Sequence, residues 1–394
     1  MVFLRKLASR ITALQPSPTL SVSEKARKLK AQGKKLVDLS IGEPDFDTPA
    51  HIKKACIEAL EKGFTHYTSS KGIIELREAI SKYYKQYFHV DVNPNSEVIV
   101  TPGSKFSLYA AIQCLVDSGD EVILLTPAWP TYWQCVESAG GRVVEVNCGD
   151  SFKLNEEALK RAITGRSKVI LFCSPNNPTG GVLSRDELKV ISDLAVDHDL
   201  YVVSDEIYRM LVYDGEKPFT MLCFNELRDR LVVVDGFSKA YAMTGWRLGF
   251  TIAPKEVIDG MDKIQQNITT CPSSFVQYAG VVALLGDQSC VDLMVKEYDN
   301  RRRLLVRELN SIEGIRCPTP RGAFYVFPDL SKISSNSIEL ADKLLDYGVV
   351  TVPGGAFGSG GEGHLRLSYA TSIDEIRRGV EIIKRFVMDS LGKH

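Results

Sequence analysis

The segment Asp235-Gly-Phe-Ser-Lys-Ala-Tyr-Ala-Met-Thr-Gly-Trp-Arg247 connects two apolar runs, Leu231–Val234 and Leu248–Ile252. Such runs are typical of buried strands, so Lys239 is expected in the connection between two strands. The glycines around it let the backbone approach a ligand closely, and Arg247 adds a permanent positive charge. Most loop lysines are solvated surface charges. Polar residues at the ends of neighbouring strands favour instead an anion held beside the Lys239 amine.

The overall composition is that of a soluble globular protein. With 394 residues and 44% apolar content, the chain is long enough for two domains. Its formal net charge of -1 gives no electrostatic basis for binding nucleic acid or an anionic membrane surface. We therefore expect small-molecule ligands, with no nucleic-acid or membrane partner.

The cysteines and histidines indicate neither a disulfide framework nor a metal site. The nine cysteines are scattered and never spaced as C-x-x-C, and the six histidines form no H-E-x-x-H pattern. A reducing, cytoplasmic location is the natural interpretation. The basic N-terminus resembles an organellar transit peptide faintly, but apolar residues from Phe3 to Leu14 favour one face of a short helix.

Alternating apolar runs and helical stretches predict an α/β fold with a mainly parallel seven-stranded sheet flanked by helices. The strands are expected at 98–100, 121–125, 142–146, 168–172, 201–204, 231–234 and 248–252. After Gly286, charged helical stretches at 291–309, 337–347 and 373–391 accompany short strands at 323–327 and 364–368, which predicts a smaller α+β domain. We expect residues 1–47 to form an N-terminal arm and part of the small domain, 48–285 the large domain, and 286–394 the rest of the small domain.

Polar motifs follow several of the predicted strands, where ligands bind in such sheets. Thr101-Pro-Gly-Ser-Lys105 opens a helix and offers free amide groups and a hydroxyl, which suits a phosphate. Trp129 could stack on a flat ring or simply fill the core. Ser174-Pro-Asn-Asn-Pro-Thr-Gly180 offers amide donors or is a turn, and Asp205 with Tyr208 could hold one ligand at two points.

The glycine-rich stretch Gly358-Ser-Gly-Gly-Glu-Gly363 matches G-x-G-x-x-G formally. It precedes a predicted strand, whereas a dinucleotide site requires it to follow a strand and open a helix. We interpret it as a flexible loop.

Together these motifs resemble the class I, fold-type I aminotransferases that depend on pyridoxal 5'-phosphate (PLP), especially the aspartate aminotransferases of bacteria and archaea. The resemblance covers about residues 16 to 388. The matching segments are Gly42–Pro49, Tyr67 with Gly72–Arg77, Ser174–Gly180, Ser204–Tyr208, Ser238–Arg247 and Leu365–Tyr369.

The resemblance implies a role for each matching residue. Lys239 would bond covalently to the cofactor aldehyde, and Asp205 would keep the pyridine nitrogen protonated. The other cofactor-binding residues would be Tyr208 and Asn177 at the phenolic oxygen, Trp129 against the ring, and Gly103, Ser104, Lys105 and Arg247 at the phosphate. Tyr67 would reach the phosphate of a neighbouring subunit, which implies a homodimer with shared active sites.

The resemblance also implies that Arg366 and the backbone of Gly42 bind the substrate α-carboxylate, in contact with Trp129 and Asn177. Because the subgroup associates the lysine at Lys105 with distal carboxylates, we expect aspartate or glutamate as amino donor and a 2-oxo acid such as 2-oxoglutarate as acceptor. Ping-pong kinetics follow. An aromatic, kynurenine or alanine aminotransferase, or a C–S lyase on the same scaffold, is the alternative.

Overall fold

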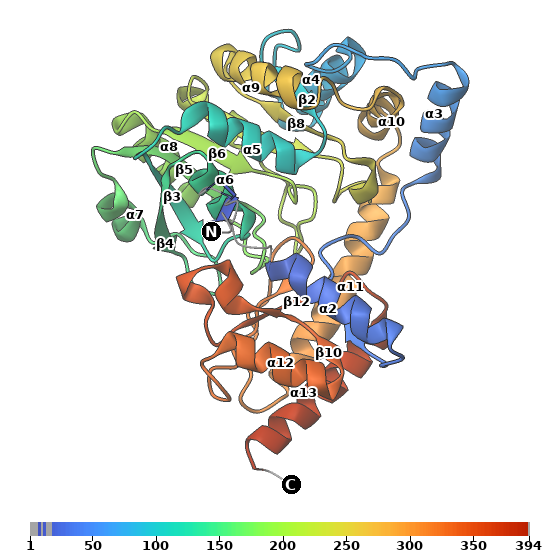
Figure 1. Cartoon of the computed structure of the whole chain (residues 1–394), viewed down its shortest axis with the longest axis vertical. Helices are drawn as coiled ribbons and strands as arrows, with labels where there is room; N and C mark the ends of the chain where they lie inside the picture. Colours follow the sequence, from blue (N-terminus) through green and yellow to red (C-terminus); the bar gives the residue numbers. More distant parts are fainter. Residues whose placement is uncertain (1–6, 9–10, 13–17, 393–394) are drawn as a thin grey trace, which may run out of the picture.

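The structure is a computed structural model that describes residues 7–8, 11–12 and 18–392. Most of the predicted apolar helix face from Phe3 to Leu14 lies outside these residues. The chain forms one large sheet and two small ones, with helices packed against them (Figure 1).

The large sheet has seven strands in the order β2-β8-β7-β6-β5-β3-β4. All neighbours are parallel apart from β8, which runs antiparallel to both β2 and β7. The predicted mainly parallel α/β fold is therefore confirmed. The strands are β2 (Val98–Thr101), β3 (Glu121–Thr126), β4 (Arg142–Asn147), β5 (Ser167–Cys173), β6 (Tyr201–Asp205), β7 (Leu231–Gly236) and β8 (Gly249–Ile252).

Successive residues of the central strands enter two different hydrophobic clusters. In β7, Val232 and Val234 belong to one cluster, whereas Leu231 and Val233 belong to the other. Side chains alternate across a strand, so both faces of the sheet are buried, which explains the nearly continuous valine and isoleucine runs. β4 departs from the expectation of two buried faces, because it lies at the sheet edge and Val146 alone among its residues is buried.

Helices cover the sheet on both sides. Helix α5 packs against β7, β8, α6 and α9, while α10 packs against α3 and α4. The helices of this part are α3 (Ala50–Glu61), α4 (Ile74–Phe88), α5 (Ser104–Leu115), α6 (Thr131–Ser138), α7 (Glu156–Ala162), α8 (Arg185–Asp197), α9 (Lys255–Ile268) and α10 (Ser274–Leu285).

The small sheets are built from the two ends of the chain. β1 (Val37–Asp38) pairs in parallel with β10 (Val349–Val350), and β12 (Leu365–Ser368) lies antiparallel between β11 (Val352–Pro353) and β9 (Tyr325–Val326). Helices α2 (Pro18–Ala31), α11 (Ser289–Asn310), α12 (Ser337–Tyr347) and α13 (Ile373–Ser390) surround them in Figure 1. The boundaries of the two predicted domains stay predictions.

The glycine-rich stretch does not open a long helix. Its residues Ser359–Gly361 form a short 3-10 turn before β12, and another 3-10 turn, Gly354–Phe357, precedes the stretch. The amide and hydroxyl of Ser359 both donate to Glu145 on β4. Dinucleotide geometry is therefore absent, as predicted, and the loop is packed onto the edge of the large sheet.

The fold presents neither a metal cluster nor a single membrane-spanning helix in the residues that the structure describes. Among residues 7–8, 11–12 and 18–392, no cluster of three or more histidine, cysteine, aspartate or glutamate side chains is placed to hold a metal. Within the same residues no single helix has the length and apolarity of a membrane span. Helices α10 and α11 together have that length and composition, but they are bent by 76° at the break between them.

Candidate active site

The side chain of Lys239 lies where the carboxyl end of β7 meets the N-terminal part of the chain. Its amine donates to the carbonyl oxygen of Gly42 at 2.5 Å and lies 5.6 Å from the ring centre of Tyr208. Burial and the positive charges of Arg366 and Arg247 lower the pKa of Lys239 to about 8, against the opposing effect of Glu43 and Asp205. A lysine with this pKa is partly neutral near physiological pH and can act as a nucleophile or a base.

Asp205 ends β6 as a buried carboxyl group without an arginine or lysine bonded to it in the described part of the chain. It accepts hydrogen bonds from the Tyr132 hydroxyl at 2.8 Å and the Ile207 amide at 3.2 Å. Burial raises its pKa to about 6, although both hydrogen bonds act in the opposite direction. The acid is therefore mostly ionised at neutral pH, at a considerable desolvation cost, which is typical of functional sites.

Tyr208, which follows Asp205 at the end of β6, and Asn177, which follows β5, line the same region. The buried Tyr208 hydroxyl lies 2.9 Å from the hydroxyl of Tyr325 on β9, and burial raises its pKa well above the usual range. The Asn177 side-chain oxygen accepts a hydrogen bond from Arg366 at 3.0 Å. Residues from β5, β6, β7 and the small sheet thus converge on one site.

Arg366 on β12 is an almost fully buried cation without a carboxylate partner in the described residues. One terminal nitrogen donates to Asn177 and the other to the Ser40 carbonyl at 2.7 Å, while Nε is buried with no partner among these residues. Burial lowers its pKa, as expected for a charge that lacks a counter-ion. An unpaired buried donor of this kind is costly unless an anion comes to it.

A third group of residues forms a candidate anion cradle at the start of α5. Gly103 has φ 93°, and a Cβ atom there would come within 2.6 Å of the Arg247 guanidinium. The first amides of a helix lack intrahelical acceptors, so those of Ser104 and Lys105 are available beside this guanidinium. The Ser104 hydroxyl, however, already donates to the Asp235 carbonyl at 2.8 Å.

Two predicted residues lie at the periphery of this arrangement, and one lies apart from it. The Lys105 amine is 4.8 Å from the ring centre of Trp129, which packs edge-on against Tyr132. Burial lowers the pKa of Lys105, with Arg247 acting in the same direction. Tyr67 is 86% exposed, so within a single chain it is not part of the site.

Two residues of the site, Tyr132 and Tyr325, could not be identified from the sequence. Tyr132 belongs to the Pro127–Tyr132 motif, but its hydroxyl contact with Asp205 joins residues 73 positions apart. Tyr325 sits in an apolar run that predicts only a strand, yet it touches both Tyr208 and the space above Gly42. A buried tyrosine needs a hydrogen-bond partner, and that requirement was the one available signal.

Comparison with known proteins identifies the family to which this site belongs. The sequence model of the family described as aminotransferase class I and II matches residues 34–383. The chain belongs to this family. The aspartate/prephenate aminotransferase of Thermus thermophilus is 42% identical over 390 residues, which cover 97% of this chain and 99% of that protein.

Other relatives differ in the substrate given in their names. Aromatic-amino-acid aminotransferase 2 of Thermococcus litoralis is 37% identical over 388 residues, covering 97% of this chain and 98% of that one. Among solved structures, the aspartate aminotransferase of Thermus thermophilus with maleate has a TM-score of 0.93 at 42% identity and covers 97% of this chain and 100% of that chain. The family is therefore shared by these relatives, whereas the substrate varies among them.

Proposed function

We propose that this aminotransferase uses PLP and transfers the amino group of an L-amino acid, best aspartate or glutamate, to a 2-oxo acid such as 2-oxoglutarate. The observation that carries the proposal is the buried Lys239 amine bonded to the Gly42 carbonyl. Burial and the charge of Arg366 lower its pKa to about 8, against the opposing effect of Asp205. An amine of this kind, set between an anion receptor and a buried acid, matches the chemistry of amino-group exchange.

The residues present fit PLP at each of its ends. Gly103, the amides of Ser104 and Lys105, and Arg247 would hold the phosphate. Asp205 would hold the pyridine nitrogen, because a buried carboxylate that accepts only neutral donors is suited to a cationic N–H group.

The remaining contacts would fix the ring. Tyr208 and Asn177 offer a hydroxyl and an amide for the phenolic oxygen, and Trp129 offers a flat face to the ring. When bound, PLP supplies an aldehyde for exchange of amino groups and a ring that withdraws electrons from the substrate Cα.

The residues of the chain then divide the work of the reaction. Arg366 and the backbone of Gly42 bind the α-carboxylate and orient the substrate, with Trp129 and Asn177 beside it. The Lys239 amine takes the proton from the substrate Cα, which requires its neutral form, and a pKa of about 8 makes that form accessible. Asp205 remains ionised and would hold the protonated pyridine nitrogen of PLP in place.

Lys105 carries the proposed preference for a distal carboxylate. Its amine lies over Trp129 and has no acidic partner in the described residues. A second carboxylate of an aspartate or glutamate substrate would supply that partner. Aromatic donors are the second candidate, favoured by the indole face of Trp129 and by the aromatic aminotransferase among the relatives. Kynurenine or alanine transfer, or C–S bond cleavage, remains the further alternative.

The direct test is an absorbance titration of the PLP-loaded protein with single amino acids in the absence of acceptor. We expect stoichiometric conversion of the bound cofactor from its aldehyde to its amine form, fastest with aspartate or glutamate. Faster conversion with phenylalanine or kynurenine would favour the second candidate. A protein that binds no PLP would contradict the proposal as a whole, and a Lys239→Ala variant provides the control for non-enzymatic exchange.

We also propose that the chain forms a homodimer in which Tyr67 completes the partner's phosphate site. Tyr67 is 86% exposed, and large apolar side chains of α3, the segment after it, α10 and α11 are exposed as well, namely Ile57, Leu60, Phe64, Leu285 and Leu293. Because α3 packs on α10, most of these side chains belong to adjoining elements. Light scattering of the wild-type protein should give the mass of a dimer. The measured mass of the Ile57→Asp variant should be lower, because a charge on the exposed apolar surface weakens association. A monomeric wild-type protein with full activity would contradict this proposal.

A further inference from the structure

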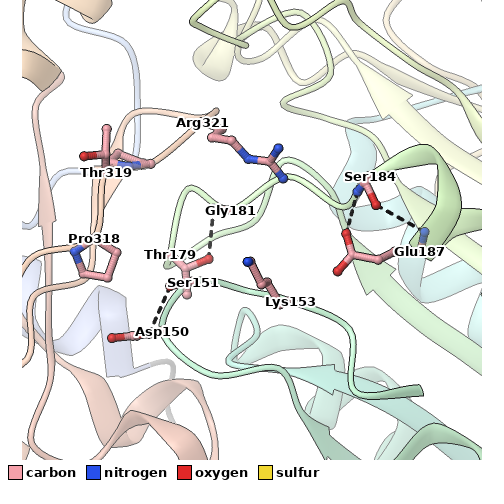
Figure 2. A pocket seen from close by; sticks show the side chains of 11 residues that line it. Asp150, Ser151, Lys153, Thr179, Gly181, Ser184, Glu187, Pro318, Thr319 and Arg321 are labelled. Carbon is pink, nitrogen blue, oxygen red and sulfur yellow. Dashed lines mark hydrogen bonds between the residues drawn. The ribbon is translucent and has the colours of Figure 1, made fainter. Parts of the chain in front are cut away.

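A second pocket lies away from the candidate active site. It has a volume of about 550 Å³ and is formed by the loop after β4, the turn that ends at Gly181 with the start of α8, and the segment 318–321 (Figure 2). None of the residues proposed above for PLP or substrate lines it. A pocket of this size is within the range of small-molecule sites.

Two cationic side chains face this pocket. Figure 2 shows the Lys153 amine and the Arg321 guanidinium pointing toward the space between their two loops. The backbone amide of Lys153 donates to the Cys148 carbonyl at 2.9 Å, but its side-chain amine has no hydrogen-bond or ion-pair partner in the residues that the structure describes. Arg321 bonds to Glu216 at 2.9 Å and to the Val182 carbonyl, which leaves further N–H groups of its guanidinium free.

The two acids in the pocket wall are already committed to other partners. Glu187 accepts from the Leu154 amide at 2.8 Å and from the Ser184 amide at 2.7 Å, so each of its oxygens has a donor. Asp150 forms an ion pair with Arg316. Glu187 keeps its negative charge, because amide donors are neutral, but neither acid is bonded to Lys153 or Arg321. Arg321 is ion-paired with Glu216, so the unpaired positive charge at the wall is that of the Lys153 amine.

The rest of the lining suits an organic molecule. Pro318 and Pro320 contribute apolar surface, and Thr319 contributes a hydroxyl group. We propose that this pocket binds a small organic anion, whose carboxylate or phosphate group lies between Lys153 and Arg321. The proposal does not depend on the substrate of the active site.

The pocket is connected to the active site through short stretches of backbone. Its wall residue Thr179 lies on the same turn as Asn177, and the amides of Arg321 and Gly322 both donate to the Gly180 carbonyl, at 2.9 and 2.8 Å. The chain continues from Gly322 to Tyr325, which contacts Tyr208. An anion in this pocket thus binds against the two segments that carry Asn177 and Tyr325.

Calorimetric titration of the PLP-loaded dimer or monomer, as isolated, tests the proposal with citrate and inorganic phosphate as probes. We expect at least one probe to bind, Lys153→Gln to weaken that binding about two- to five-fold because Lys153 is exposed, and Lys153→Arg to retain it. Lys384→Gln, which removes an exposed lysine on α13 outside the pocket, should leave it unchanged. The probe that binds more tightly identifies the head group as carboxylate or phosphate.

Three results would overturn the inference. Neither probe binds; or binding is equal in Lys153→Gln and wild type; or Arg366→Lys abolishes binding while Lys153→Gln does not, which would place the anion in the active site. Because the Lys153 amine makes no hydrogen bond or ion pair within the described residues, its variants should melt at the wild-type temperature. Failure here would leave the PLP titration of the active site unaffected, so the two proposals are tested separately.

Discussion

Arg302 and Arg366 are both buried arginines, but their surroundings are opposite. Arg302 on α11 forms a two-pronged ion pair with Asp214, bonds to Asp299 and donates to the Pro320 carbonyl at 2.6 Å. Burial alone would lower the pKa of Arg302, but these carboxylates raise it. Arg366 has two neutral acceptors, an unpartnered Nε and a lowered pKa.

Arg302 therefore stabilises the fold, whereas we propose that Arg366 binds a ligand. Removing either partner of a buried ion pair whose donors are all satisfied destabilises the fold. A buried cation with only neutral acceptors has a desolvation cost that no carboxylate offsets. The same contrast distinguishes Asp214 from Asp205, since the pKa of Asp214 is lowered by its bonds to Arg302 while burial raises that of Asp205. Function is therefore expected where buried charge is least compensated.

The largest expected effect is on substrate binding at Arg366. Arg366→Lys should raise the KM for the amino donor by about 100-fold or more, because a point charge replaces a two-pronged carboxylate receptor. Its unfolding free energy should change little, since the residue has no ion pair to lose. Steady-state kinetics and urea unfolding of the same sample measure both quantities. A wild-type KM would show that Arg366 does not bind the substrate carboxylate.

Arg302→Met should show the reverse pattern. The substitution removes the buried cation and leaves the Pro320 carbonyl without its donor, whereas the partly exposed Asp214 and Asp299 keep Arg303 as a cationic partner. We expect the unfolding free energy to fall by about 1–3 kcal/mol. The KM of the folded fraction should stay close to wild type. Urea unfolding with kinetics in low denaturant is the measurement, and a variant with wild-type stability would show that the network is dispensable.

Asp205→Asn should stabilise the PLP-free protein while abolishing most activity. Because the folded pKa is raised from 3.8 to about 6, the ionised form costs stability above pH 6, and this cost disappears as the pH falls toward 3.8. We expect a gain of about 1–3 kcal/mol at pH 8 and almost none at pH 4. Thermal unfolding of both proteins across that range is the test, and a loss of stability at pH 8 would contradict it.

Tyr132→Phe should act on Asp205 without touching PLP or substrate. The lost hydrogen bond favours the protonated acid, so the pKa of Asp205 should rise further, and the acid limb of the kcat/KM profile should move upward by about one pH unit. A uniform loss of activity at every pH would instead indicate a packing role for the Tyr132 ring.

Lys105→Ser is expected to give the smallest effect. An exposed charge pair contributes about 0.2–1 kcal/mol, so the KM for aspartate should rise about two- to five-fold. The KM for phenylalanine, which has no distal carboxylate, serves as the internal control and should not change. Equal changes for the two donors would remove Lys105 from the basis of substrate choice.

The sequence predicted the large sheet well because its central strands are buried on both faces and so consist of valine and isoleucine runs, as in Leu231–Val234. The roles predicted for the residues at the strand ends come from the resemblance of their motifs to a family, because the sequence does not specify distances between side chains. β10 and β11 were missed, because strands of two residues leave almost no pattern.

The missed contacts have a common cause. Tyr132 and Tyr325 reach the site from distant parts of the chain, and nothing local to either residue specifies its partner. The contrast between Arg302 and Arg366 was equally invisible, since both occur in charged or amphipathic stretches and differ only in what the fold places around them. Burial and the supply of counter-ions are tertiary properties.

We propose that Lys239 is the residue that bonds covalently to the PLP aldehyde. Borohydride reduction of the PLP-loaded protein, followed by peptide mass spectrometry, tests it directly. We predict one pyridoxyl group per chain, carried by Lys239. A label on Lys105 or another lysine, or an unlabelled chain that still transfers amino groups, would contradict the assignment of Lys239.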